Sequence, residues 1–297
     1  MKITPDELSD LMKEIVIVEL SQNIDSNKII KIFSFKFLVY FRNQIPENWY
    51  SSLLELLLKL ISNNDALFVN SSLLTIEKFL FMKSPQDYKL HKFQACVNQN
   101  LASLINTFYP LIKSYNPQAM ICFYKTLTLT QDENLLPVFS SIQGIIIDVF
   151  NLIVSLKSDQ LNTEYNYQFF ESVAYLLKKI IKLDVNSYVK FRDEINKILL
   201  VVLNNNISDL INYLFQIYGL ELMLDRNFSD LQKTLFNYVY DVNKWTVESK
   251  HLFPAFVDYW KVCFNTISEQ IYSNNLLNSI LLIVLKVSFN FKISFFI

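Results

Sequence analysis

The sequence predicts an all-α protein built as an α-solenoid of about six helix pairs. Apolar helix pairs recur about every 40 to 50 residues, a period typical of HEAT and armadillo arrays. Glycine is almost absent, with two in 297 residues, and Asn-Gly or Asp-Gly hairpin turns do not occur. Each amphipathic helix can bury only one stripe, so HEAT-like stacking of neighbouring pairs supplies the core.

The elements follow from the apolar stripes and the signals for helix starts. The pairs are placed at 5–44, 48–82, 92–129, 133–182, 185–225 and 228–272. Residues 1–274 are thus predicted to form one solenoid segment, and residues 275–297 an apolar, atypical tail. Within the fifth pair, one face carries Tyr188, Phe191, Ile195, Ile198, Leu199 and Val202, followed in the next helix by Ile207, Leu210, Ile211, Leu214, Phe215, Tyr218 and Leu222.

Four short motifs mark helix starts. Thr4-Pro5-Asp6-Glu7 is a capping box with proline at the first helical position, and Thr130-Gln131-Asp132-Glu133 repeats the box without proline. Asn116-Pro117 and Ser84-Pro85 are predicted to join turns to helices, because proline fits a first helical turn.

Composition limits the compartment and the partners. The net charge is −1, which gives no global basic field to attract nucleic acid or anionic membrane. Cys96, Cys122 and Cys263 are odd in number and far apart, so reduced thiols in the cytosol or nucleus are expected. The N-terminus lacks the pattern of a signal peptide.

The C-terminal stretch 276–297 leaves a membrane alternative open. It is long enough to cross a bilayer and about two-thirds apolar, but polar residues such as Lys286 and Lys292 interrupt it. A solenoid helix followed by an aberrant end is favoured over a membrane anchor.

No motif for catalysis, a cofactor or a metal is present. Gly144 and Gly219 both lie inside helical runs, which excludes a glycine-rich phosphate loop. His91 and Cys96 are expected on different helix faces, and adjacent carboxylates such as Asp193 and Glu194 point apart. We therefore expect a protein that is not an enzyme, with no catalytic residues, no cofactor and no metal ligands.

One polar stretch is a candidate for partner binding. Trp245 lies among Lys244, Glu248 and other polar residues just before a predicted helix. A tryptophan in such a loop can anchor a partner, although packing over a repeat junction is the favoured alternative.

Several segments resemble one protein family in the same order. They are Phe37-Leu38-Val39-Tyr40-Phe41-Arg42-Asn43-Gln44-Ile45-Pro46, residues 52–61, residues 75–80, residues 166–173, residues 211–217 and residues 245–256. Collinear over about 240 residues, they resemble the middle of CAS-type exportins, HEAT-repeat members of the importin-β superfamily.

The resemblance implies a non-catalytic nuclear transport receptor, present in the nucleus and cytoplasm and at the nuclear envelope and pore. Ran-GTP and importin-α are the implied partners of the complete protein, with nucleoporins as further partners; nucleic acid is not expected as a partner, and a membrane is not favoured. Arg42 and Asn43 end a second helix, and second helices line the concave surface of such receptors. These two residues could touch a partner, although closure of the turn between repeats is favoured.

Two alternatives remain beside this interpretation. One is an unrelated HEAT-repeat scaffold, and the other is the membrane-anchored helical protein. The repeats that flank the middle of such receptors are not found here, so the chain is expected to be a fragment or a degenerate paralogue. An open solenoid end also predicts self-association.

Overall fold

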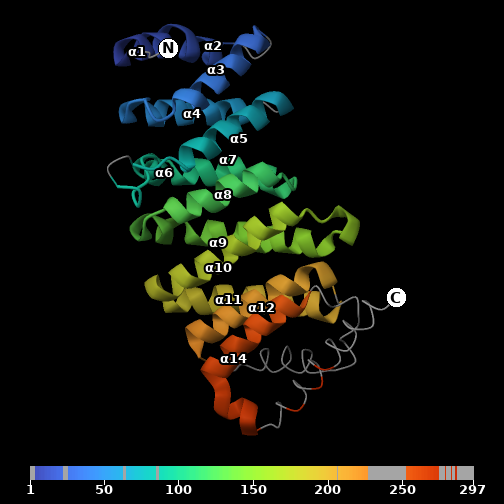
Figure 1. The fold of residues 1–297 in the computed structure, drawn as a ribbon. Coiled ribbons are helices and arrows are strands. Elements are labelled where there is room, and N and C mark those ends of the chain that lie inside the picture. The colour runs from blue at the N-terminus through green and yellow to red at the C-terminus, as the bar shows by residue number, and fades with distance from the viewer. Residues whose placement is uncertain are drawn as a thin grey trace. The chain divides into compact units, whose positions relative to one another are not determined.

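The computed structural model describes residues 4–22, 26–62, 65–84, 87–205, 207–226 and 252–273, and the single residues 278, 282 and 285. Every regular element within these ranges is a helix (Figure 1). The chain divides into two compact units. Unit 1 comprises Met1–Val149 and Asn162–Ser172, and unit 2 comprises Phe150–Leu161 and Val173–Ile297.

Unit 1 consists of successive helix pairs. Its elements are α1 (Pro5–Leu11), the π-helical segment η1 (Met12–Val16), α2 (Ile17–Ser21), α3 (Lys28–Phe41), the 3-10 segment η2 (Glu47–Trp49), α4 (Tyr50–Ile61), α5 (Ala66–Leu80), α6 (Gln94–Gln99), α7 (Leu101–Lys113) and α8 (Pro117–Leu129). The predicted pairs match these elements, except that the first helix of the third pair is split into α6 and α7 at Asn100.

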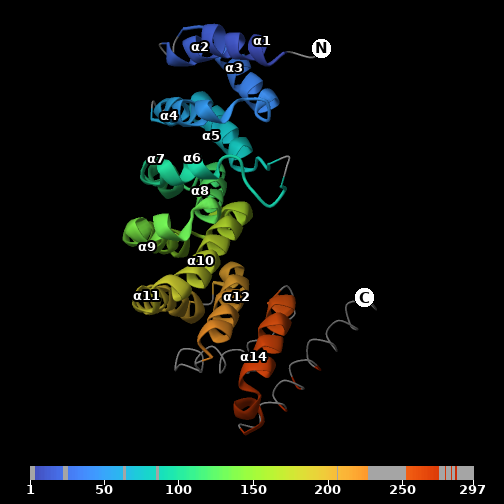
Figure 2. The ribbon, with the colours of Figure 1, turned by 90° about the vertical axis from the view of Figure 1, so that its left-hand side faces the viewer.

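The helices of unit 1 form two layers. The second helices of successive pairs pack in the order α3, α5, α8, and α2, α4 and α7 pack in the other layer. Figure 2 shows α4 and α7 on one side and α5 and α8 on the other. Aromatic side chains fill the space between the layers. The centre of the Phe93 ring lies 5.3 Å from the centre of the Tyr50 ring and 5.4 Å from the centre of the Phe79 ring. The abundant aromatic residues thus serve as core fillers here.

Two long helices have residues in both units. They are α9 (Asp132–Ser155) and α10 (Thr163–Leu183), separated by the 3-10 segment η3 (Ser158–Gln160). Among the described helices, α9 is long and apolar enough to cross a membrane by length and composition alone. Its apolar residues include a stripe of buried positions spaced by three or four, and Asp148 on the same helix accepts a hydrogen bond from Tyr109 of α7. These contacts are those of a helix in the array.

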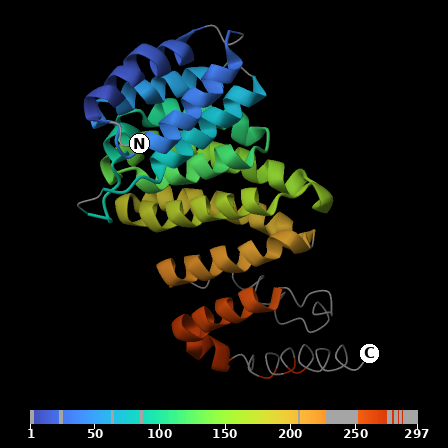
Figure 3. The same cartoon turned by 45° about the horizontal axis from the view of Figure 1, so that its top comes forward.

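Unit 2 continues the same pattern with α11 (Val185–Asn204), α12 (Ser208–Asp225) and α14 (Phe253–Ser273). Helices α12 and α14 pack side by side, as Figure 3 also shows. All members of the predicted stripe on α11 are buried, and so are those on α12; only Ile207, just before α12, is half-buried. The periodicity therefore identified the core face correctly.

The helix starts were predicted with mixed success. Thr4 and Glu7 form the expected capping box, and the Asn116 side chain accepts a hydrogen bond from Ala119 N–H, with Pro117 beginning α8. The second capping box is wrong, because Thr130 is the C-cap of α8 and its hydroxyl donates to the Thr126 carbonyl at 2.8 Å. Pro85 of the Ser84-Pro85 motif lies outside the described residues; residues 87–93 form turns rather than a helix, and α6 begins only at Gln94.

The scarcity of glycine leaves other residues in the left-handed backbone region. Helix α7 ends in a Schellman motif in which Tyr115, with φ of 63°, occupies the position that usually favours glycine. Its hydroxyl compensates for this conformation: it accepts from Asn162 N–H at 2.9 Å and donates to Asn166 Oδ1 at 2.8 Å. The turn between α7 and α8 is thereby fixed to the start of α10.

Candidate protein-binding surface

Helix α3 exposes an apolar stripe on the side opposite its core face. Ile29, Phe33 and Tyr40 are 71%, 62% and 78% exposed, and their spacing of four and seven residues places them on one face. The Lys36 ammonium lies on the same face, 5.5 Å from the centre of the Phe33 ring. Large apolar side chains gathered on one solvent-facing stripe are typical of protein interaction sites.

Helix α5, the next helix of the same layer, carries a second apolar stripe. Leu67, Leu74 and Phe81 are exposed and spaced by seven residues, two full turns of the helix. The Lys125 ammonium of α8 lies 4.3 Å from the centre of the Phe81 ring, a cation–π contact. The second-helix layer of unit 1 therefore presents apolar side chains together with lysine.

Arg42 and Asn43 lie at the end of α3, as the sequence indicated. The Arg42 guanidinium donates to the Val39 carbonyl at 2.6 Å, and the Asn43 carbonyl accepts from the Lys92 ammonium at 3.3 Å. The first contact closes the turn at the end of α3, and the second connects this turn to Lys92 at the start of the third pair. Partner binding by these two residues stays a prediction.

Lys244, Trp245 and Glu248 lie outside the residues that the structure describes, and so does most of the apolar tail 275–297. Their partner-binding and membrane roles stay predictions.

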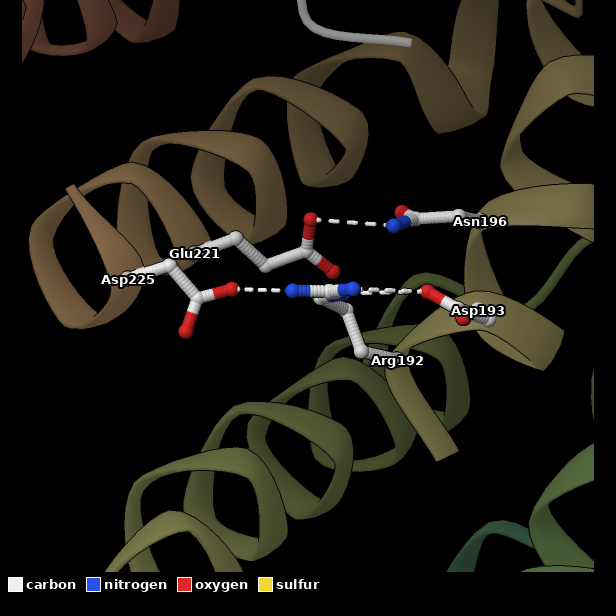
Figure 4. Close-up of polar contacts among 5 residues, drawn as sticks. All are labelled: Arg192, Asp193, Asn196, Glu221 and Asp225. Atoms are coloured by element: carbon white, nitrogen blue, oxygen red, sulfur yellow. Dashed lines mark hydrogen bonds and ion pairs between the residues drawn. The ribbon is translucent and has the colours of Figure 1, made fainter. Parts of the chain in front are cut away.

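A polar cluster joins α11 to α12 in unit 2 (Figure 4). The Arg192 guanidinium donates to Asp193 at 2.9 Å on its own helix and to Asp225 at the end of α12. One turn further along α11, Asn196 Nδ2 donates to Glu221 Oε2 at 3.2 Å. The cluster thus connects the two helices at two levels.

Glu221 is the most perturbed acid among the described residues. It is only 4% exposed, and burial raises the pKa of its carboxyl to about 8, against the smaller lowering by the Asn196 hydrogen bond and Arg192. Glu221 is therefore held largely neutral near pH 7. Such a pKa is also found in catalytic acids, but this side chain is closed off from solvent between packed helices, so it locks α11 to α12 rather than meeting a substrate.

The cysteines lie in the core. Cys96, Cys122 and Cys263 are all buried and free. Burial raises the pKa of each thiol, to about 12 for Cys263, so the reactive thiolate is scarce at neutral pH. Within the described ranges, no group of three or more histidine, cysteine, aspartate or glutamate side chains could hold a metal ion.

Sequence reasoning did not find Glu221 or the exposed stripe of α3. The signal for Glu221 was faint: a glutamate flanked by Leu220 and Leu222 in a helix whose other sides are also apolar. For α3 the signal was stronger, because large apolar residues surround the whole helix while a helix at the surface buries only one face.

Comparison with known proteins agrees with this fold. The chain is similar to exportin-2 of Homo sapiens and of Bos taurus, each 20% identical over 210 residues that cover 70% of this chain and 21% of the relative. It therefore spans about a fifth of the length of these relatives. Exportin-2 of Xenopus laevis is 20% identical over 205 residues.

A solved structure shares the architecture. The exportin Cse1 in its cargo-free, cytoplasmic state superposes with a TM-score of 0.72 at 19% identity, covering 92% of this chain and 28% of that one. The likeness confirms the helical solenoid expected from the repeat period. A family model described as CAS/CSE protein, C-terminus, matches residues 77–289, most of the chain, whereas the sequence resemblance had indicated the middle of the receptor. The chain belongs to the CAS/CSE protein family.

Proposed function

We propose that this chain is part of a nuclear transport receptor that carries importin-α from the nucleus to the cytoplasm in a Ran-GTP-dependent cycle. The observation that carries the proposal is the family match over residues 77–289. On this proposal the protein moves between nucleus and cytoplasm through the nuclear pore, where nucleoporins are further partners. The chain itself binds proteins and performs no chemistry.

The surface of unit 1 supports a role in protein binding. Exposed apolar side chains on α3 and α5 provide contact area for a partner. The neighbouring Lys36 and Lys125 provide charges that orient the partner on this surface. The buried thiols offer no accessible nucleophile. Family membership favours this function over the unrelated HEAT-repeat scaffold, because that alternative requires the ordered resemblance to be accidental.

The test uses the native gene product that contains this chain, purified from its own cells and presented to immobilised importin-α. We expect capture with Ran loaded with a non-hydrolysable GTP analogue and much weaker capture with Ran-GDP. Ran-GTP and importin-α should each tighten binding of the other by the same factor, since coupling between two binding sites is reciprocal. Capture that is absent, or independent of the nucleotide on Ran, would refute the proposal.

A further inference from the structure

Three basic side chains come together at one end of the second-helix layer of unit 1. An antiparallel bridge pairs Lys83 with His91, and the Ser84 N–H donates to the Leu90 carbonyl at 2.8 Å beside it. The bridge brings Lys83 Nζ to 2.5 Å from His91 Nε2. Lys125 from α8 completes the group, which we name the base cluster: Lys83, His91 and Lys125.

Lys83 Nζ lies within hydrogen-bond distance of His91 Nε2, and the charges of the two lysines act on the His91 ring and on each other. Burial, and after it the charges of Lys83 and Lys125, lower the pKa of His91. Burial and then the charge of Lys83 lower the pKa of Lys125. The like charges of the two lysines destabilise each other unless an anion lies beside them.

No carboxylate among the described residues pairs with the base cluster. The nearest acid on α5, Glu77, already accepts from the Lys78 ammonium at 2.9 Å and from the Gln118 amide at 2.6 Å. In the loop, Asp87 accepts from the Lys89 N–H at 2.9 Å. Neither Glu77 nor Asp87 forms an ion pair with Lys83 or Lys125, so the positive charge of the cluster is open to an external anion.

An exposed aromatic ring adjoins the cluster. Phe81, the C-cap of α5, is 45% exposed, and Lys125 lies over its ring. Leu74 continues the apolar surface two turns earlier along α5. An aromatic ring beside several bases matches a peptide in which acidic residues flank an apolar one.

We propose that the base cluster, with Phe81, is a docking site for an acidic peptide segment of a partner protein. The bases bind its carboxylates and Phe81 contacts an apolar side chain between them. Charge complementarity and the adjacent aromatic ring select this occupant over nucleic acid, which would require a basic field that the net charge of −1 does not provide. The inference goes beyond the proposed function and holds whichever protein supplies the segment.

The experiment measures fluorescence anisotropy of a fluorescein-labelled peptide with glutamates on both sides of one phenylalanine, titrated with the full chain. The same peptide with glutamine at every glutamate is the matched control. We expect binding of the acidic peptide only, weakened by salt and strengthened as the pH falls from 7 to 5, because the lowered pKa of His91 moves its protonation below the usual histidine range.

Variants assign the binding to the cluster. Lys83→Gln and Lys125→Gln should each weaken binding about tenfold, as expected for loss of one charge-assisted hydrogen bond. His91→Gln should remove the pH dependence in this range, and Phe81→Ala should weaken binding without changing its salt dependence. Lys59→Gln, on the exposed side of α4 in the other layer, makes the same charge change and should leave binding unaltered. Circular dichroism verifies that each variant is folded.

Three outcomes would overturn the proposal. The first is no binding of the acidic peptide by the wild-type chain, and the second is binding that the two lysine variants leave unchanged. The third is equal or tighter binding of inorganic phosphate or of an oligothymidine, which would make the cluster a general anion site or a nucleic-acid site. None of these involves Ran or importin-α, so this test and that of the proposed function fail independently.

Discussion

Replacing Glu221 by glutamine tests whether unit 2 contains a buried acid that titrates near neutral pH. Glutamine has nearly the same shape, and its carbonyl can accept the hydrogen bond that Asn196 Nδ2 donates to Glu221 Oε2. Its amide can also donate to Asn196 Oδ1, which has no partner in the wild-type structure. The change therefore removes the titration while the contact between α11 and α12 is kept.

The sign and size of the effect follow from the pKa of Glu221, about 8 in the folded chain and near 4.5 when unfolded. Between these pH values the folded state holds a proton that the unfolded state has lost, so the free energy of unfolding falls as the pH rises. Above the pKa of Glu221 in the folded chain, the free energy of unfolding no longer falls with pH on account of this group. At 1.36 kcal/mol per pH unit, the fall between pH 5 and pH 7 is about 2 to 3 kcal/mol.

The assay is urea denaturation of wild type and Glu221→Gln at several pH values, followed by circular dichroism. Other titrating groups contribute to both curves, so the informative quantity is the difference in the free energy of unfolding between the two proteins. It should move by about 2 to 3 kcal/mol in favour of the variant from pH 5 to pH 7. Asp159→Asn, which changes an exposed carboxylate of unit 2, is the control and should give parallel curves. If the free energies of unfolding of Glu221→Gln and wild type also differ by the same amount at every pH, Glu221 is not a buried acid with a raised pKa.

Three further predictions concern the turn after α7 and the core. Tyr115→Phe removes the hydroxyl that bonds Asn162 and Asn166, and should lower the free energy of unfolding by about 1 to 2 kcal/mol in urea; an unchanged midpoint would contradict the role of that hydroxyl. Leu38→Ala, at a fully buried position of α3, should cost about 2 to 5 kcal/mol in the same assay, and a cost below about 1 kcal/mol would show that α3 packs loosely. Cys122 should react with Ellman's reagent only on unfolding, because its thiol is buried and its pKa raised; rapid labelling of the native chain would place it at the surface.

Most of the fold was predictable because its signals are local. A buried stripe such as that of α11 depends on residues three and four apart, and the cap at Asn116 depends on a hydrogen bond across three residues. The capping box at Thr130 failed for a related reason. The motif does not reveal that the preceding residues are helical, and there the hydroxyl bonds back to Thr126 instead of forward.

The candidate sites were less predictable because they join residues distant in sequence. Asn196 meets Glu221 only after α11 and α12 pack, and the burial that raises the pKa of Glu221 exists only in the folded chain. Lys125 likewise reaches Phe81 only because α8 stacks on α5. Periodicity shows which face of a helix is buried, but not which polar groups of two helices will meet.

A net charge near zero describes the whole chain and not its surface. Charges in water are screened beyond about 8 to 10 Å at physiological salt, so a partner at contact responds to the groups nearest to it rather than to the sum. In unit 1 those groups include three bases without a paired carboxylate among the described residues, next to the exposed ring of Phe81. Long-range attraction of nucleic acid and short-range recognition of an acidic peptide are therefore separate questions. The composition bears on the attraction of nucleic acid. Recognition of an acidic peptide depends on the arrangement of α5, the loop that follows it and α8.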